Sequence, residues 1–575
     1  MASAALRSPV PHRGQVPPPA PALPWRGRGL RYPASRWIAV PAVTGAAGLG
    51  VLSTLRPLLA AVLAVLAVLV AAVWARPALA ACLLIFLTPL TAGIDRGSAL
   101  PVLRPQEALA VVLGGTLAAR AVVRLRTGQL PRIRLGPVEW ALVLMAVASS
   151  LLPLLRMAVL QEAIGQDDVL YALVLWKYLG LYVLIRASVS TDRHVRACLW
   201  LSVAASTVVA GLAILQSLGL FGVPHLLATY YAPFGYTDAF AARGSSTLGL
   251  PAATADLAVI NLAIVAGLWT RFRRYRPVLA VAAAVLVMGA LSAGEFSSAL
   301  GLLAGVFCIA IVIQKPRLLW TVGPAALVAG FALWPVISRR LSGFESASGL
   351  PVSWTGRLAN LQAYFWPKLF SGGNFLLGVR PAARIPVATQ ATGFVWIESG
   401  YTWLLWAGGI PLLAGFVFLA WAAARRGWRA ARGGMDGRSI AGIGLFTAIV
   451  VICVLMTFDP HLTYRGTGDA FFTLLALAAP RTVRAASAAV PTAPSAVPTA
   501  PRTVLTGPSP APTAPSPAPT APRTAPAAPP AGTTAPLAGR PSENHATRQA
   551  APVRRRTPPA PGATQHDPAI REVGQ

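Results

Sequence analysis

The feature that most constrains this chain is a succession of apolar stretches, each reaching or approaching the length needed to cross a bilayer. A hydrocarbon core about 30 Å thick takes about 20 helical residues. Inside lipid the backbone must satisfy its own hydrogen bonds, so such stretches form helices. We therefore expect an all-α polytopic membrane protein with about 12 to 14 transmembrane helices. The stretches are 38–54, 57–74, 77–93, 105–119, 136–155, 168–187, 197–218, 251–269, 277–293, 296–313, 317–336, 400–423, 439–457 and 469–480.

The composition agrees with a membrane protein, because 55% of the 575 residues are hydrophobic and only 12% are charged. The net charge of +31 raises the question of nucleic acid or anionic lipid. Most of the arginines lie in short loops between apolar stretches or in two polar tails, which membrane topology explains. We expect no nucleic-acid partner. The four cysteines are far apart and contain no CxxC pair, so they indicate neither a disulfide framework nor a zinc site.

The chain divides into three parts by composition. Residues 1–36 are rich in Pro and Arg and are expected to form a disordered basic N-terminal arm. Residues 37–480 form the membrane domain. Residues 481–575 are rich in Pro, Ala and Thr, with PTAP starting at 491, 498, 512 and 519, and are expected to be a disordered tail. The tail could alternatively bind proline-recognising partners, or the inner leaflet through its basic cluster.

Arginine-rich loops predict the orientation. If both termini are cytoplasmic, almost all the arginines of the inter-span loops stay inside, as the positive-inside rule requires. The predicted location is therefore a multi-pass protein of the cytoplasmic membrane. Two long connections then lie outside, 219–250 and 338–393, and the second precedes the third-last helix. The predicted cytoplasmic loops contain Arg120, Arg124, Arg126, Arg132 and Arg134, then Arg193 and Arg196, then 271–276, then Lys315 and Arg317, and then Arg425, Arg426, Arg429, Arg432 and Arg438.

Four arginines remain on the predicted external side: Arg243, Arg357, Arg380 and Arg465. The sequence has no P-loop, no GxGxxG after a strand, no HExxH and no GxSxG, so soluble-enzyme signatures do not account for them. A guanidinium group next to a membrane helix favours an anionic partner, and its planar fork suits phosphate oxygens. Each arginine could instead snorkel or pair with a nearby acid.

Three stretches occur in order around the large loop: ARGSSTLGLPAATADLAVINLAI from Ala242, SWTGRLANLQAYFWPKLFSGGNFLLGVRP from Ser353, and ESGYTWLLWAGGIPLLAG from Glu398. As an ordered set they resemble the O-antigen ligase and polymerase superfamily, over roughly 140–480. These are membrane glycosyltransferases that use undecaprenyl-diphosphate-linked sugars. The resemblance implies a GT-C fold of the second type, with an external catalytic cavity and with no metal or other cofactor.

The resemblance also assigns roles to single residues. Arg243 and Arg357 match the family arginines that hold the donor diphosphate, and the run Gly378, Val379, Arg380 looks like the glycine-containing turn before the catalytic helix. Tyr401 and Gly409 keep the family spacing. Glu398 stands where the ligases have histidine. This departure makes a polymerase or another transferase at least as good an expectation as a ligase.

The residue chemistry supports the same site without the family. Fixed guanidinium groups can stabilise a diphosphate leaving group, and a carboxylate such as Glu398 can accept the acceptor's proton. Glu398 could alternatively be a helix N-terminal carboxylate favoured by the macrodipole. Asp459, His461 and Arg465, together with Tyr464 and Asp469, crowd the last predicted external loop. They could line the same cavity as substrate-binding groups or solvate a tight turn.

The sequence therefore predicts a glycosyltransferase that transfers or polymerises a lipid-diphosphate-linked glycan at the external face. Its expected partners are an undecaprenyl-diphosphate-linked oligosaccharide or polysaccharide, membrane lipid, and other envelope-glycan assembly proteins. A transporter or flippase of lipid-linked glycans is the alternative, although such proteins tend to show internal repeats, and none is seen here. A catalytically inactive scaffold is a third reading.

Overall fold

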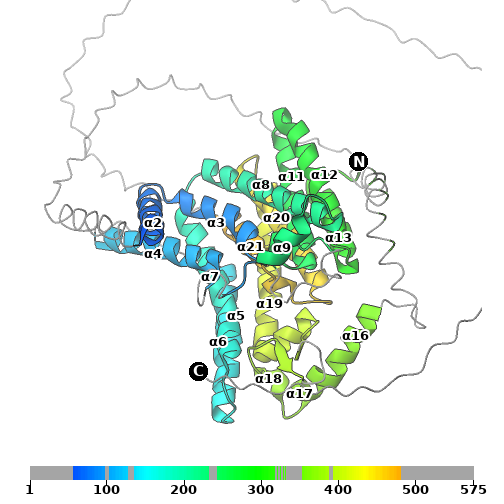
Figure 1. Cartoon of the computed structure of the whole chain (residues 1–575). Coiled ribbons are helices and arrows are strands. Elements are labelled where there is room, and N and C mark those ends of the chain that lie inside the picture. Colours follow the sequence, from blue (N-terminus) through cyan, green and yellow to red (C-terminus); the bar gives the residue numbers. More distant parts are fainter. Residues whose placement is uncertain are drawn as a thin grey trace, which may run out of the picture. The chain divides into compact units, whose positions relative to one another are not determined.

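The computed structural model describes residues 56–96, 103–126, 135–231, 243–317, 352–387 and 393–480, with a few further positions between 320 and 338. Helices dominate these residues (Figure 1). The exception is a small antiparallel hairpin of β1 (Arg384–Pro386) and β2 (Phe394–Trp396), in which Ile385 faces Val395. The all-α expectation therefore holds for the membrane-spanning part, and the hairpin belongs to the long loop before α19.

Ten helices in this part of the chain are long and apolar enough to cross a membrane. The chain is therefore a polytopic α-helical membrane protein. Adjacent helices α6 (Gln166–Ala172) and α7 (Val174–Ser188) act as one span, as do η2 (Arg273–Tyr275) and α12 (Arg276–Ser292). The other spans are α2 (Pro57–Ala75), α4 (Pro105–Arg126), α5 (Pro137–Val159), α8 (Asp192–Ser217), α11 (Pro251–Arg271), α13 (Phe296–Ile313), α19 (Gly400–Arg432) and α20 (Gly437–Leu455).

Four of the fourteen expected spans are not among these ten. Two of them are helices that are shorter than expected, α3 (Ala78–Thr91) and α21 (Thr467–Leu477). The stretch 38–54 and nearly all of 317–336 lie outside the described residues, as do the N-terminal arm and the C-terminal tail. Two further short helices, α9 (Val223–Tyr231) and η1 (Ser246–Leu248), border the first long connection.

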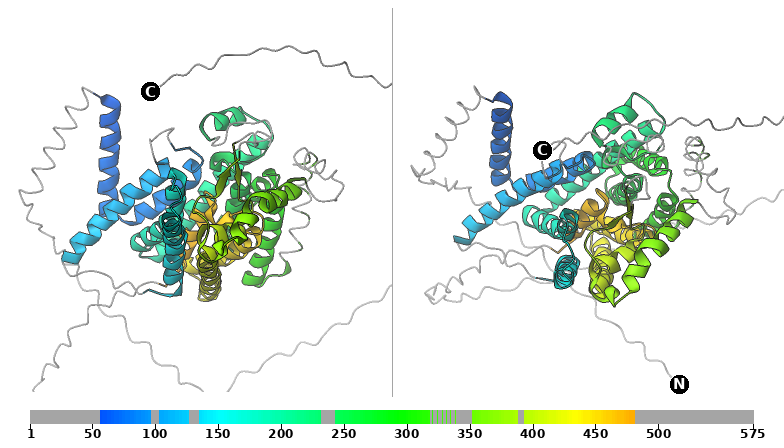
Figure 2. Two further views of the ribbon diagram at one scale, coloured as in Figure 1. Left: turned by 90° about the horizontal axis from the view of Figure 1, so that it is seen from below. Right: turned by 60° about the horizontal axis from the view of Figure 1, so that its bottom comes forward.

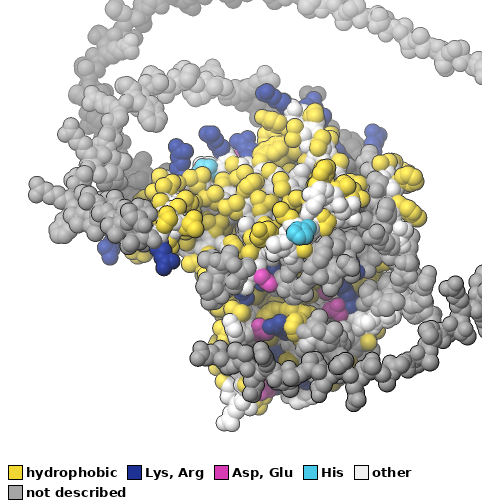
Figure 3. Space-filling model, viewed as in Figure 1, with side chains coloured by type: hydrophobic (Ala, Val, Ile, Leu, Met, Phe, Trp, Pro, Cys, Tyr) yellow, Lys and Arg dark blue, Asp and Glu magenta, His cyan; other side chains and the backbone are white. Residues whose placement is uncertain are grey.

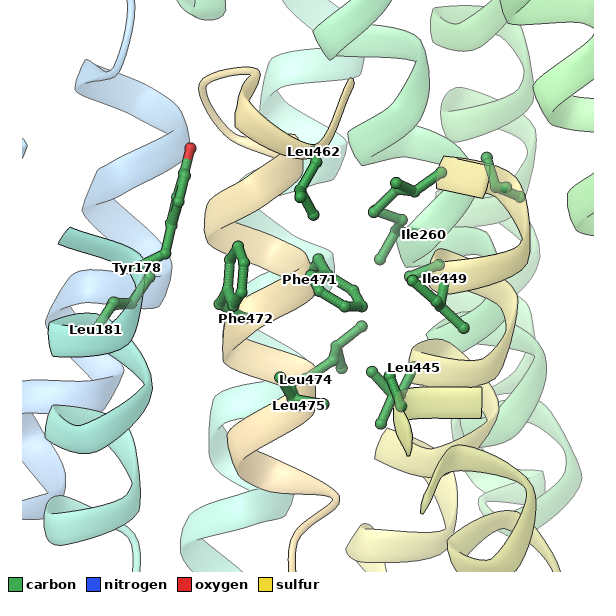
Figure 4. Packing of buried hydrophobic residues seen from close by; sticks show 14 of the residues in the cluster. Tyr178, Leu181, Ile260, Leu445, Ile449, Leu462, Phe471, Phe472, Leu474 and Leu475 are labelled. Carbon is green, nitrogen blue, oxygen red and sulfur yellow. The ribbon is translucent and has the colours of Figure 1, made fainter. Parts of the chain in front are cut away.

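The short helix α21 lies in the centre of the bundle, between the helices of the first half and those of the second (Figures 1 and 2). Figure 4 shows Phe471 pointing toward Ile449 of α20 and Phe472 toward Tyr178 of α7. The rings of Phe472 and Tyr178 stack with centroids 4.7 Å apart. Because α21 is apolar on several sides, it can be buried along its length. Its neighbour α11 is also central. In the most apolar 18-residue part of each helix, 83% is buried in α11 but only 11% in α2.

Helix α19 is kinked at Gly409, which has φ 64° and ψ −159°. Pro411 follows two residues later and has no backbone N–H to donate. The turn after α18 (Asn374–Leu377) packs into this kink, and the Val379 N–H donates to the Trp406 carbonyl at 2.7 Å. A Cβ atom on Gly378 would lie 2.8 Å from the Gly408 nitrogen, so only glycine permits this approach.

The long loop before α19 is itself ordered, in α16 (Val352–Asn360), the π-helical turn η4 (Leu361–Phe365), α17 (Trp366–Phe370) and α18. We call the end of the bundle that carries these elements the loop end; it is at the bottom of Figure 1. Figure 3 shows Lys and Arg side chains along the upper edge of the hydrophobic surface and further ones below it, whereas the acidic side chains visible on this face all lie in the lower part. On this face the acids therefore gather toward the loop end.

Candidate functional site

Arg357 is the centre of a charged cluster at the loop end. Its Nη1 donates to Asp459 Oδ2 at 2.7 Å, and its Nε lies 3.7 Å from Glu398 Oε1. The three side chains come from α16, from the segment just before α19 and from the loop after α20. The fold thus brings together three of the site residues that were predicted from the sequence. We call Arg357, Glu398 and Asp459 the Arg357 cluster.

Glu398 lies two residues before the first residue of α19, and its carboxylate is 31% exposed. The helix is capped by Ser399, whose side chain accepts a hydrogen bond from the Thr402 N–H. The Glu398 carboxylate instead accepts a hydrogen bond from Asn360 Nδ2 at 3.4 Å. The capping oxygen of α19 therefore belongs to Ser399. Glu398 directly precedes this cap, so the helix dipole still favours its negative charge.

Asp459 is nearly buried, with 8% of its side chain exposed. Burial raises the pKa of this carboxyl group to about 6, although the neighbouring Arg357 and His461 charges oppose the increase. Burial by itself lowers the pKa of Arg357, but the Asp459 and Glu398 carboxylates more than compensate and raise it. Arg357 is therefore a fixed cation between two acids of unequal burial.

His461 extends the cluster into the bundle. Its Nδ1 lies 2.6 Å from Asp256 Oδ2 of α11, and Thr467 Oγ1 donates to the same oxygen. The His461 ring is 1% exposed, and its Nε2 is buried without a hydrogen-bond partner in the described part of the chain. Burial by itself lowers the pKa of His461, but the Asp256 carboxylate raises it by more, so the pKa lies above its ordinary value. The His461 N–H also donates to the Asp459 carbonyl at 2.8 Å.

Arg243 is half-buried beside the turn that joins α12 to α13. The following residue, Gly244, donates its N–H to the Ser292 carbonyl at 3.0 Å. Glu295 is the residue directly before α13 in the same turn, and its charge acts on Arg357, Asp459 and His461. Arg243 makes no ion pair with the residues that the structure describes. The backbone bond from Gly244 to Ser292 therefore places Arg243 beside the turn that carries Glu295, although the two residues are far apart in the sequence.

The other nominated residues have separate partners. Arg380 forms a two-pronged ion pair with Asp168 of α6 at 2.6 and 3.0 Å, which holds the long loop against that helix. The hydroxyl group of Tyr401 donates to the Cys453 carbonyl at 2.7 Å, so it joins α19 to α20. Arg465 lies 3.8 Å from Asp95, after α3. None of these three contacts the Arg357 cluster in the described residues.

Asn360, Asp256 and Glu295 were not assigned to this site from the sequence, although the cost of an acid between two spans marked Glu295 as a candidate functional residue. Asn360 is one helical turn after Arg357 on α16, so helical spacing could have identified it. Asp256 and His461 are 205 residues apart, and no local pattern predicts their contact. Glu295 was noticeable only as an acid beside an apolar stretch.

The arrangement offers cationic hydrogen-bond donors beside a partly exposed carboxylate. Two guanidinium nitrogens of Arg357 face acids, while Nη2 has no partner among the described residues and remains for an incoming anion. The same residues contain no group of three His, Cys, Asp or Glu side chains arranged to hold a metal ion. No protein-family model, curated protein or solved structure matches this chain.

Proposed function

We propose that the protein is a membrane glycosyltransferase of the O-antigen ligase and polymerase type. It would transfer or polymerise a lipid-diphosphate-linked glycan at the external face of the cytoplasmic membrane. One observation carries the proposal: Arg357 and Glu398 come from two separate family-like stretches and meet within 3.7 Å at the loop end. Such a pair supplies an anion ligand and a proton acceptor side by side.

In the proposed reaction the donor is a glycan whose anomeric carbon is bonded to a lipid diphosphate. Arg357 Nη2, assisted by Arg243, binds the diphosphate oxygens. The bond between the anomeric carbon and the diphosphate breaks, and its electron pair leaves with the diphosphate. An acceptor hydroxyl forms the new bond to the anomeric carbon and gives its proton to Glu398. Fixed guanidinium groups stabilise the negative charge that develops on the leaving group.

Asp459 and His461 support this site in the proposal. Asp459 holds Arg357 by a 2.7 Å charge-assisted hydrogen bond, which is strong and directional. His461 is itself held by Asp256 in the buried interior. Through its backbone bond to Asp459, His461 fixes the loop that carries this carboxylate.

The proposed orientation places the loop end outside the cell. The end opposite to it carries Arg271, which donates to the Gly434 carbonyl, as well as Arg429 and Arg432. These cations favour the cytoplasm under the positive-inside rule. The proposed partners are an undecaprenyl-diphosphate-linked oligosaccharide or polysaccharide, membrane lipid and other envelope-glycan assembly proteins.

A transfer assay tests the proposal directly. Purified protein is reconstituted in vesicles with a synthetic lipid-diphosphate-linked glycan and a hydroxyl-bearing acceptor, and release of lipid diphosphate is measured together with the new glycan product. The proposal predicts both products without added metal, and their loss in Glu398→Gln but not in Arg429→Ala, an exposed arginine at the opposite end. Movement of the intact donor across the vesicle without product would instead support the transporter alternative.

A further inference from the structure

A second group of cations lies at the junction of α3, α4, α7 and α21, which contact one another. Arg96 follows α3, Arg104 directly precedes α4, Lys177 is in the first turn of α7, and Arg465 precedes α21. Arg104 and Arg465 therefore lie at the starts of helices, where the positive end of the helix dipole adds to their charge. Lys177 lies within the single span formed by α6 and α7. We call these four residues the Arg465 cluster.

The acids near this cluster make close side-chain contacts with only one of its four cations, Arg96. Glu107 accepts hydrogen bonds from Arg96 at 3.1 and 3.3 Å, and so its carboxylate belongs mainly to Arg96. Asp469 accepts the Gly466 N–H at 3.0 Å, at the start of its own helix.

The remaining three cations have only long contacts with acids among the described residues. Arg104 lies 3.7 Å from Glu107, Arg465 lies 3.8 Å from Asp95, and Lys177 lies 4.0 Å from Asp469. By contrast, Arg357 and Arg380 each have a carboxylate within 2.7 Å. The Arg465 cluster is therefore poorly neutralised by comparison with the other arginines at this end.

Two guanidinium nitrogens in the cluster are buried without a hydrogen-bond partner in the described residues, Arg104 Nε and Arg465 Nη1. Only 15% of each of these two side chains is exposed. A buried charged donor without an acceptor costs free energy, which an anion would recover. The six residues 97–102, between Arg96 and the end of the loop, contain no acidic side chain that could serve.

The electrostatics agree with this geometry. Burial and the nearby Arg104 charge lower the pKa of Arg465 to about 10, and burial and the Arg96 charge lower the pKa of Arg104. Like charges thus repel inside a partly dehydrated region. Such an arrangement is unfavourable until an anion enters it.

We propose that Arg104, Arg465 and Lys177 bind a phosphate group, separate from the Arg357 cluster. Phosphate oxygens accept hydrogen bonds well from guanidinium forks at helix starts and from an ammonium group beside them. The phosphate is that of a lipid headgroup or of a free anion. The site does not depend on the proposed transfer reaction.

One loop serves both clusters. The segment between α20 and α21 carries Asp459 to the Arg357 cluster and Arg465 to the Arg465 cluster. The hydroxyl group of Tyr178 donates to the Thr463 carbonyl in the middle of this segment at 3.2 Å. Occupation of one cluster can therefore bias the geometry of the other.

The test measures thermal melting and bound lipid, the latter by native mass spectrometry, on purified full-length protein in neutral detergent. The probes are dioleoylphosphatidic acid, dioleoylphosphatidylcholine and inorganic phosphate. We expect phosphatidic acid to raise the melting temperature of the parent more than phosphatidylcholine does. Arg465→Gln and Arg104→Gln should each weaken its binding at least tenfold, and Arg465→Lys should lose less. Arg429→Gln is the matched control for the loss of one surface charge.

Two further readouts separate a binding site from a structural ion pair. Because Arg465 has no close acid and is repelled by Arg104, Arg465→Gln should melt no lower than the parent without added anion. A lower melting temperature together with full stabilisation by phosphatidic acid would overturn the proposal. So would binding that survives Arg465→Gln but is lost in Arg357→Gln. Stabilisation by inorganic phosphate alone, abolished by Arg465→Gln, would support the site with free phosphate as its occupant.

Discussion

Arg357 Nη1 and Asp459 Oδ2 are 2.7 Å apart, although the two residues are 102 positions apart in the chain. This contact attaches the ordered part of the long loop to the connection between α20 and α21. Since Asp459 is nearly buried, removal of Arg357 would leave a dehydrated carboxylate without its partner, at a typical cost of roughly 3 to 5 kcal/mol. This ion pair therefore holds α16 in position, whereas the later part of the loop is held by Arg380 and Asp168.

The raised pKa of Asp459 predicts a pH-dependent contribution to stability. The folded pKa of about 6 exceeds the ordinary value of 3.8, so the folded state holds the proton more tightly. The resulting stability is fully present below about pH 4 and is lost as the pH rises through 6. Relative to Asp459→Asn, the parent should gain about 2 kcal/mol between pH 7.5 and 4.5. Chemical or thermal unfolding of both proteins across this range measures the difference.

The comparison with Asp459→Asn removes the contributions of other titrating groups, because these are common to both proteins. Parallel pH profiles for the two proteins would show that Asp459 has an ordinary pKa. A parent that loses stability relative to the variant on acidification would show that its pKa is depressed by Arg357.

Gly409 provides a test of the kink in α19. Alanine there would have φ near 64°, and its Cβ would lie 2.3 Å from the Leu376 carbonyl oxygen. Gly409→Ala should therefore lower the stability by at least roughly 1 to 3 kcal/mol. Gly115→Ala on α4 is the matched control, since its Cβ would meet no atom within 4 Å and alanine favours a helix. Thermal melting in detergent should show a clear loss for the first and no loss for the second.

Much of the membrane fold could be predicted because hydropathy is a local property. Stretches such as 251–269 and 439–457 correspond closely to α11 and α20. The short helix α21 was also marked by its apolar residues, but its central position was not, because that depends on contacts with α7, α11 and α20. The β1–β2 hairpin was missed, since three-residue strands carry too little pattern to be recognised.

The candidate site could be predicted only in part. The arginines and Glu398 were identified from polar residues beside apolar stretches, which is again a local signal. The sequence could not distinguish Arg357, which meets Glu398 and Asp459, from Arg380, which is paired with Asp168. This difference depends on which helix ends meet in the folded bundle, and it cannot be predicted from the spacing of residues along the chain.

The proposed orientation predicts the accessibility of two exposed positions at opposite ends. Ser371→Cys lies after α17 at the loop end, and Met435→Cys lies between α19 and α20. If the positive-inside rule determines the topology, a membrane-impermeant thiol reagent should label the first in intact cells and the second only after permeabilisation. The reverse pattern would place the loop end in the cytoplasm and exclude the proposed external reaction.

Arg243 and Arg357 should both be needed for use of the donor. In the proposed site each guanidinium group binds diphosphate oxygens, so loss of one stabilising group should reduce turnover on the order of 100-fold or more. Lysine should restore only part of the activity, because an ammonium group lacks the planar fork. The transfer assay compares Arg243→Ala, Arg357→Ala and the two Lys variants at equal folded protein. Full activity in both Ala variants would remove these residues from the site.

Arg380 is the matched control for that experiment. It is an arginine of the same loop, but its carboxylate partner is on α6, so Arg380→Ala should affect stability more than the affinity for donor. A donor-binding defect in Arg380→Ala at unchanged stability would mean that the diphosphate is bound by a different set of arginines.

Under the proposed function, Glu398 takes the position that histidine has in the ligases, so its role as a base needs its own test. If its carboxylate accepts the acceptor's proton, Glu398→Gln should lower turnover by roughly 100-fold to 10,000-fold, the usual range for loss of a general base. Donor binding should change little, because Gln can still accept the hydrogen bond from Asn360. The melting temperature should also change little, because Ser399 rather than Glu398 caps α19.

Glu398→His distinguishes two roles of Glu398, that of a proton acceptor and that of an ion-pair partner of Arg357. Imidazole can accept a proton but, when neutral, cannot replace the carboxylate that lies 3.7 Å from Arg357 Nε. Partial activity, with a pH profile displaced toward the titration of histidine, would support proton transfer at this position. Ser399→Ala is the control, because it removes the cap of the same helix and leaves the carboxylate in place. If Glu398→Gln turns over at the parental rate, Glu398 is not the base, and Asp459, with its pKa of about 6, becomes the nearest carboxylate that could accept the proton.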